Sequence, residues 1–141
     1  MCARMNRMEK TRNTWQRQCI TDILDGAQTP LTATEVYRRA AQRAPALAKS
    51  TVYRNLDAMV ERGELERGFL ENGESFFVLA DRGHHHYMIC RDCNRMQHLP
   101  ECPIAHLQPD LAETSGFVPV DHIVQVYGYC RDCAQNHSKS D

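Results

Sequence analysis

Apolar residues in the first half of the chain recur at the three- and four-residue spacing of amphipathic helices. The first such stretch ends at Gly26, a residue type that commonly stops a helix, and the third ends before Gly63. Before the second stretch, Thr32 and Glu35 have the spacing of a capping box, in which each side chain bonds the other's backbone amide. The pattern predicts helices over residues 14–26, 33–43 and 50–62.

After residue 63 the pattern changes to two short strand-like runs, at 65–70 and 75–79. Between them, Asn72 and Gly73 form a dipeptide that suits the type I′ turn of a β-hairpin. Three helices followed by a hairpin is the element order of a winged helix-turn-helix. Residues 1–80 are therefore predicted to form a winged-helix DNA-binding domain.

Residues 81–83 are predicted to be a hinge and residues 84–141 a second domain. Pro109 lies inside a stretch with helical spacing and predicts a kink or an early break. The expected fold class is α+β, with a winged helix-turn-helix followed by a small α/β dimerisation domain. The elements predicted for the second domain are a strand at 84–90, a helix at 103–115, a strand at 122–129 and a loose polar tail at 134–141.

Charge is distributed unevenly along the chain. Residues 1–63 hold 11 Lys+Arg against 6 Asp+Glu, a surplus of +5, and residues 64–141 hold 6 against 12, a balance of −6. A basic half suits a partner that carries phosphate, although chance clustering on solvated faces would give the same asymmetry. Because no apolar run is long enough to span a membrane and no secretory signal occurs, we expect a cytoplasmic protein with no membrane partner.

Four of the seven cysteines form two identical Cys-Arg-Asp-Cys knuckles, at 90–93 and 130–133. Two residues between paired cysteines allow both sulfurs to approach one ion, and four thiolates complete a tetrahedral zinc site. Since such a site leaves no position for water, this zinc would be structural. The predicted ligands are Cys90, Cys93, Cys130 and Cys133.

Other interpretations of the cysteines fit less well. A redox-active pair would need only one knuckle and a thioredoxin-like context, which this sequence lacks. In a reducing cytosol, cysteines serve as metal ligands more often than as disulfides. Cys2, at the terminus, and Cys19, on an apolar helix face, are expected to have no part in metal binding.

All seven histidines lie between residues 84 and 137, and three of them are consecutive. In a strand, His84 and His86 would share one face, and His85 and Tyr87 would share the other. His122 stands near the start of the later strand. A polyhistidine run can be a solvated linker, but its position just before a zinc knuckle favours metal ligation.

Several motifs, taken together and in this order, resemble the ferric uptake regulator family along nearly the whole chain. The resemblance implies a homodimeric, metal-activated repressor whose recognition helix carries the Thr-Val-Tyr-Arg stretch. It also implies a second metal site at the hinge, which sets the angle between the DNA-binding domains. The motifs are Thr14-Trp15-Gln16-Arg17, Thr32-Ala33-Thr34-Glu35-Val36-Tyr37, Ser50-Thr51-Val52-Tyr53-Arg54-Asn55-Leu56, His84-His85-His86 through Cys90 and Cys93, and Tyr127-Gly128-Tyr129-Cys130 through Cys133.

One set of family ligands at the hinge corresponds to three histidines of this chain, His84, His86 and His122. The fourth family ligand is a helix carboxylate, and it aligns with Ala105 here. Its replacement could be His106, or Cys102 one helical turn earlier, because residues four apart share a helix face.

A second family set bridges the wing and the second domain, and the chain departs from it. Leu79 or Ala80 stands where a Cys or Asp is expected, and Tyr87 replaces a histidine. Because the set of histidines and carboxylates that holds iron in a peroxide sensor is broken, a peroxide sensor is disfavoured. The remaining candidates for this set are His85, His98 and Glu66.

Imidazole and thiolate ligands suit zinc better than manganese. The chain is therefore predicted to be a zinc-sensing repressor, with an iron regulator as second and a nickel sensor as third alternative. Each chain would hold one structural zinc and one or more regulatory zincs. Filling the regulatory site would favour the state in which two recognition helices reach successive major grooves of a pseudo-palindromic operator.

Basic and hydroxyl side chains of the first and third helices are candidates for phosphate or base contacts. For each arginine taken singly, a solvated surface charge is the alternative. The tyrosine could pack on a thymine methyl group or on its own domain. The predicted DNA-binding residues are Arg12, Arg17, Lys49, Ser50, Thr51, Tyr53 and Arg54.

Two other classes of function stay open. A zinc-dependent hydrolase would need three ligands, an open position and a general base, but no His-Glu-x-x-His or nucleophile motif occurs. A non-regulatory zinc-binding adaptor would bind DNA weakly or not at all, and its binding would not depend on metal. The basic first half favours the repressor, whose partners would be double-stranded operator DNA and a second copy of the chain, with no small organic substrate.

Overall fold

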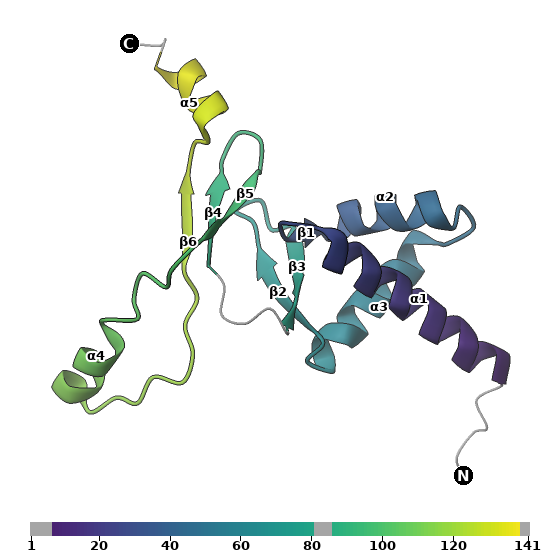
Figure 1. The fold of residues 1–141 in the computed structure, drawn as a ribbon, viewed down its shortest axis with the longest axis horizontal. Helices are drawn as coiled ribbons and strands as arrows, with labels where there is room; N and C mark the ends of the chain where they lie inside the picture. The colour runs from purple at the N-terminus through teal and green to yellow at the C-terminus, as the bar shows by residue number, and fades with distance from the viewer. Residues whose placement is uncertain (1–6, 81–85, 139–141) are drawn as a thin grey trace. The chain divides into compact units, whose positions relative to one another are not determined.

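The computed structural model describes residues 7–80 and 86–138 (Figure 1). The chain divides into two compact units, residues 1–82 and 83–141. None of the described helices is both long enough and apolar enough to cross a membrane.

Three helices and a three-stranded antiparallel sheet form the first unit. The strand order is β1-β3-β2, so the β2–β3 hairpin is flanked by the short strand β1. The predicted order of three helices and a hairpin is confirmed, and β1 is an addition to it. The elements are α1 (Arg7–Gly26), β1 (Leu31–Thr32), α2 (Ala33–Arg43), α3 (Lys49–Glu61), β2 (Leu65–Phe69) and β3 (Ser75–Leu79).

The apolar faces of the three helices meet in one core. Ile20 of α1, Val36 of α2, and Val52, Leu56 and Met59 of α3 are each no more than 1% exposed. Burying an aliphatic side chain of this size stabilises the fold by roughly 1.5–3 kcal/mol relative to leaving it exposed. This core fixes α3 by one face and leaves its other faces available.

The start of α2 confirms half of the predicted capping box. The Thr32 hydroxyl oxygen accepts the backbone N–H of Glu35 at 3.2 Å. The predicted reciprocal bond, from the Thr32 backbone N–H to the Glu35 carboxylate, is not among the bonds of the described residues. The carboxylate instead accepts from the Nε atoms of Arg38 and Arg39, each at 2.9 Å. These two arginines, Arg38 first, lower the pKa of Glu35 to about 2.

The hairpin turn differs from the predicted type I′. That turn requires a positive φ at both central residues, and among the described non-glycine residues only Asn94 has one. Here the backbone N–H of Gly73 donates to the Leu70 carbonyl at 2.9 Å, and Gly73 itself takes a φ of 86°. The glycine is thus needed, but Asn72 is not in the left-handed region.

A three-stranded mixed sheet with two short helices forms the second unit. Its central strand β4 (His86–Cys90) pairs with β5 antiparallel and with β6 parallel, in the order β5-β4-β6. The buried apolar residues among those described in this unit are few: Tyr87, Ile89, Cys90 and Met96. The other elements are β5 (Met96–Leu99), α4 (Gln108–Ser115), β6 (Gln125–Gly128) and α5 (Arg131–His137).

Three predicted elements of the second unit need correction. The helix expected over 103–115 begins only at Gln108, because Pro109 is accommodated in the first turn, where its missing N–H is not required. The strand expected over 122–129 is confined to 125–128, so His122 lies in the loop before it. The tail expected over 134–141 is wrong as far as residue 137, since α5 runs to there.

A substitution at Gly68 of β2 tests the packing of the β2–β3 hairpin. A Cβ atom at Gly68 would overlap the buried ring of Phe76, its partner in β3. Gly68→Ala is therefore expected to lower the free energy of unfolding by about 1–3 kcal/mol, measured by urea denaturation. Gly26→Ala is the matched control, because a Cβ there meets no atom within 4 Å. Equal effects of the two substitutions would contradict the packing described.

Candidate metal centres and DNA-facing side chains

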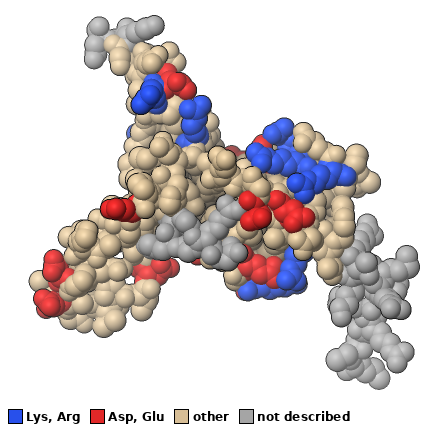
Figure 2. Space-filling model, viewed as in Figure 1, with Lys and Arg blue, Asp and Glu red and all other residues tan. Residues whose placement is uncertain are grey.

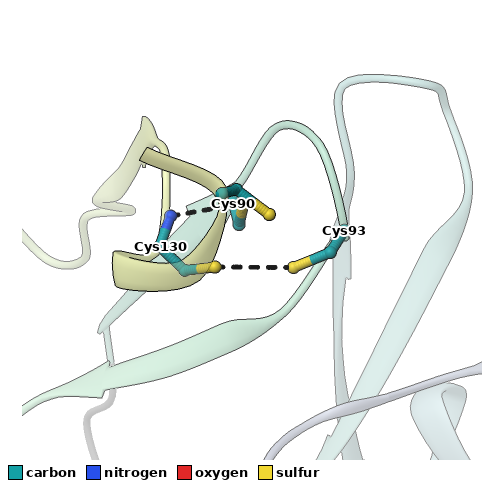
Figure 3. Close-up of side chains that lie close together, drawn as sticks. Cys90, Cys93 and Cys130 are labelled. Carbon is teal, nitrogen blue, oxygen red and sulfur yellow. Dashed lines mark hydrogen bonds between the residues drawn. The ribbon is translucent and has the colours of Figure 1, made fainter. Parts of the chain in front are cut away.

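Four cysteine thiols meet at the end of β4, and their sulfur atoms all lie within 4.8 Å of one another. Cys90 ends β4, Cys93 follows in the turn to β5, and Cys130 and Cys133 come from the start of α5. The sulfurs of Cys93 and Cys130 are 3.8 Å apart (Figure 3). A tetrahedral zinc–thiolate site, with bonds of about 2.3 Å, has sulfur–sulfur distances of about 3.8 Å. The donor set, hereafter the four-thiol cluster, therefore fits a four-coordinate ion.

Backbone hydrogen bonds shape both knuckles. In the first, the N–H of Asn94 donates to the Cys90 carbonyl at 3.0 Å, and the N–H of Cys90 donates to the Arg95 carbonyl at 2.9 Å. Asn94 has a φ of 57°, a left-handed conformation in which asparagine is several-fold enriched. In the second, the N–H of Cys130 donates to the Cys90 sulfur at 3.3 Å, so the backbone itself joins the two knuckles (Figure 3).

The pKa values of two thiols in the cluster are shifted in opposite directions. The pKa of Cys90 falls to about 6, mainly because the backbone N–H groups of Cys130 and Cys93 donate to its sulfur. The pKa of Cys133 rises above its ordinary value, first because of the neighbouring Cys130 thiol and then because of burial. One thiolate forms readily, and a cation is needed to stabilise the others.

Two exposed contacts, one between a carboxylate and a histidine and one an ion pair, also join the knuckles. Asp92 lies 2.7 Å from His137 of α5, and Asp132 lies 3.2 Å from Arg95 after the first knuckle. The two aspartates occupy the same position in the duplicated Cys-Arg-Asp-Cys motif, and each contacts a basic residue next to the opposite motif. The sequence shows this duplication, but it does not predict the contacts of the two aspartates, because these depend on the position of α5.

A second group of ligands lies at the opposite end of β4. His86 begins β4 and is 3% exposed, while Cys102 and His122 lie in the loops before α4 and β6. His122 Nε2 is 3.0 Å from His86 Nε2 and 3.2 Å from the Cys102 sulfur. A tetrahedral zinc site has such separations at about 3.3 and 3.6 Å. Small outward shifts would let these three residues, hereafter the mixed site, hold an ion.

Gln108, the first residue of α4, orients the ring of His122. Its side-chain nitrogen Nε2 lies 2.9 Å from His122 Nδ1, on the opposite side of the ring from the donor atom of the mixed site. As placed, the amide nitrogen donates to Nδ1, and turning the amide by 180° would bring its oxygen to accept the Nδ1 proton and leave the ring nitrogen Nε2 of His122 free to bind a metal. The sequence does not predict this role, because a partner of a metal ligand follows no spacing rule.

The segment around the mixed site carries negative charge. Residues 96–130 include no Lys or Arg, and Figure 2 shows acidic but no basic side chains around α4 on the face in view. Such a surface raises the local concentration of cations. Its carboxylates belong to Glu101, Asp110, Glu113 and Asp121.

The remaining predicted ligands do not join either group within the described residues. His106 is exposed in the turn before α4, and it cannot share a helix face with Cys102 because residues 103–107 form turns. His98 lies on β5 beside Tyr87, with ring centroids 5.7 Å apart. Glu66 is exposed on β2 of the first unit. His84 and His85 lie outside the described residues.

Tyr53 of α3 makes contacts within its own unit. Its ring packs partly buried against the core, its hydroxyl lies 3.5 Å from the Thr34 hydroxyl, and the Lys49 ammonium lies 5.4 Å from its ring centroid. These contacts hold the side chain against the body of the unit. They support the second of the two roles considered for this tyrosine.

The other predicted DNA contacts lie near the start of α3 and along α1. Ser50 and Arg54 are exposed and Thr51 is half-buried. Arg17 is exposed as well, and its guanidinium donates to Glu64 at 2.8 Å. The side chain of Arg12, in the first part of α1, lies outside those described.

Comparison with known proteins identifies relatives along most of the chain. The model of the ferric uptake regulator family matches residues 8–127. The ferric uptake regulation protein of Neisseria meningitidis is 31% identical over 121 residues, which cover 85% of this chain and 84% of that protein.

Solved structures of similar fold include regulators named for different metals. The ferric uptake regulator of Helicobacter pylori superposes with a TM-score of 0.78 at 20% identity, covering 91% of this chain and 88% of that one. FurB of M. tuberculosis, described as a zinc uptake regulator, superposes with a TM-score of 0.51 at 28% identity, covering 87% and 95%. The first likeness concerns the fold alone.

Removing one thiolate tests the four-thiol cluster. Cys133→Ser is expected to lose tightly held metal and to lower the melting temperature, because a neutral hydroxyl replaces a thiolate ligand. The measurements are metal content per chain, after purification without added metal, and thermal unfolding. Cys19→Ala, which removes a buried thiol from the core of the first unit, is expected to lose stability but keep its metal. Unchanged metal content in Cys133→Ser would contradict a four-thiolate site.

Proposed function

Since this chain belongs to the ferric uptake regulator family, and is therefore a metal-responsive transcription regulator, we propose that the ion it senses is zinc. The four-thiol cluster would hold a structural zinc, and the mixed site an exchangeable one. The observation that carries the proposal is the convergence of two imidazoles and one thiolate in the mixed site. Because the family consists of transcription regulators, the hydrolase alternative is set aside.

The donor atoms of the mixed site favour zinc over iron or manganese. Sulfur and imidazole nitrogen suit zinc, whereas manganese prefers oxygen. Ala105 supplies no ligand, so the site lacks a carboxylate at that position. His84, two residues before His86 in the sequence and part of the same family ligand set, is proposed as the fourth ligand. Iron is the second candidate, because the curated relative from Neisseria meningitidis is named a ferric uptake regulation protein.

The mixed site connects three segments of the second unit: the start of β4, the loop before α4 and the loop before β6. An ion bound there would fix both loops to the sheet. A metal shifts a conformational equilibrium only as far as it binds one state more tightly. We expect zinc to favour the state that presents α3 to DNA.

We also propose that the protein acts as a homodimer, formed through the second unit. Apolar side chains are exposed in one segment of it: Phe117 is 72% exposed, Val118 77%, Val120 95% and Ile123 85%. Exposed apolar groups gathered in this way mark interaction surfaces. A symmetric dimer would offer one α3 to each half-site of an operator. Because its partner would be operator DNA, we propose that the protein acts in the cytoplasm.

Cys102→Ala tests the sensing role. The wild-type protein is expected to bind two zinc ions per chain, to lose one to mild chelation, and to require that one for tight binding to a duplex selected from a random-sequence library. Cys102→Ala should keep the chelation-resistant zinc but lose DNA binding that responds to zinc, with the second ion bound at least about 10–100-fold more weakly. Metal content, competition with a zinc chelator and DNA binding are the measurements.

Two comparisons make this experiment decisive. His106→Ala, on the turn beside the mixed site but not part of it, should behave as wild type. Fe²⁺ and Mn²⁺ are titrated in parallel, and activation of DNA binding by either of them but not by zinc would overturn the zinc assignment. DNA binding that ignores all three metals would overturn the sensing role itself.

Arg54→Ala tests the DNA-reading helix. Arg54 is exposed on α3, and loss of one arginine contact to a base or phosphate costs about 1–3 kcal/mol of binding free energy. Binding to the selected duplex is expected to weaken accordingly while the zinc content stays unchanged. Unaltered affinity would show that this side chain does not contact DNA.

A further inference from the structure

A polar groove with a volume of about 520 Å³ runs between α1 and α3 in the first unit. On α3, its lining residues recur at helical spacing, so they form one face of the helix. This face adjoins the one that packs into the core. The residues that line the groove, hereafter the α1–α3 groove, are Asn13, Thr14, Gln16, Arg17, Thr51, Arg54, Asn55, Ala58 and Arg62.

Three guanidinium groups and no carboxylate line the α1–α3 groove. Arg54 and Arg62 make no ion pair with any residue in the described part of the chain, although Arg67 nearby on β2 pairs with Asp57. Arg17 is bound on one side by Glu64, which does not line the groove. Positive charge is therefore concentrated where the unit itself supplies little to balance it.

A buried amide in the same groove has a donor with no acceptor in the described part of the chain. Gln16 is 6% exposed, and its side-chain oxygen accepts from the amide nitrogen of Asn55 at 3.2 Å. That bond turns the Gln16 Nε2 atom away from Asn55, and Nε2 finds no acceptor among the residues the structure describes. Buried donors without an acceptor are rare in folded proteins. A ligand with several acceptor oxygens would satisfy both this amide and the arginines.

We infer that the α1–α3 groove is a phosphate-binding site, in which Arg54, Arg62 and the Gln16 amide bind the oxygens of one phosphate group. Guanidinium groups match phosphate oxygens in geometry as well as charge. The inference rests on the proposed function for its source of phosphate, the DNA backbone. Thr51 and Arg54 belong both to this groove and to the helix proposed to lie in the major groove, so a flanking backbone phosphate would be within the same footprint. A free phosphate ion is the other source of the same chemistry.

The experiment measures how DNA binding depends on salt. Each lost phosphate contact lowers the slope of log affinity against log salt concentration by about one. For the zinc-loaded protein, Arg62→Ala is expected to lower the slope by about one. It should weaken binding to the selected duplex and to a mixed-sequence duplex of equal length by the same factor. Gln16→Leu, which keeps the volume but removes the donors, should weaken both duplexes in the same uniform way.

A matched control isolates the groove from general charge loss. Arg43→Ala removes one exposed arginine from the last turn of α2, outside the groove, and is expected to leave the slope unchanged. Thermal unfolding and zinc content confirm that each variant is folded. If Arg62→Ala and Arg43→Ala give the same slope as wild type while the wild type binds DNA, the groove does not hold a backbone phosphate.

Titration of the metal-loaded protein with inorganic phosphate, followed by NMR, separates the two sources. Saturable chemical-shift changes that are confined to the groove and lost in Arg62→Ala would support a binding site for free phosphate, even if the salt dependence of DNA binding does not change. No saturable shift together with an unchanged slope would overturn the inference and leave the proposed function intact. A wild-type protein that binds no DNA with or without zinc would overturn the proposed function, and the phosphate titration would then decide the groove alone.

Discussion

The fold of the second unit depends on the contact between the end of β4 and the start of α5, where four thiols meet. The apolar residues buried in this unit, among those described, are few, and one of them is Cys90 itself. Such a core contributes little stability, so a cross-link between distant segments has to contribute the remainder. In the proposed structural site, metal–thiolate bonds would provide this cross-link, because a bound cation stabilises thiolates that would otherwise repel one another. Once β4 is fixed at Cys90, its other end places His86 in the mixed site.

Spacing within the sequence predicts the parts of this protein that rest on local rules. The core stripe of α3, the Thr32 cap and the two cysteine knuckles each follow from residues a few positions apart, and the structure has them. The helix α5 does not, because its contacts are with residues far along the chain. Asp92 reaches His137 across 45 positions, and no periodicity contains that information.

Gln108 and Gln16 show why polar residues are harder to predict than apolar ones. Each is assigned by a single hydrogen bond, Gln108 by its contact with His122 and Gln16 by its contact with Asn55. Those bonds depend on where a helix begins or on which faces of two helices meet. Moving an apolar residue by one position disrupts the apolar periodicity of a helix. A glutamine leaves that periodicity the same whether or not it makes such a hydrogen bond. The sequence therefore predicts ligands better than it predicts the residues that orient them.

The position of Cys102 follows from where α4 begins. A helix over 103–115 would have aligned residues 102 and 106 on one face and made His106 an equal candidate for the mixed site. Because Pro109 is accommodated at the first turn, the helix starts at Gln108, and residues 103–107 are left as turns. The thiol then reaches His122 from a loop while His106 points elsewhere, exposed. The position of Pro109 thus favours the sulfur of Cys102 over the imidazole of His106 as a donor of the mixed site, and the donor set governs which metal such a site would prefer.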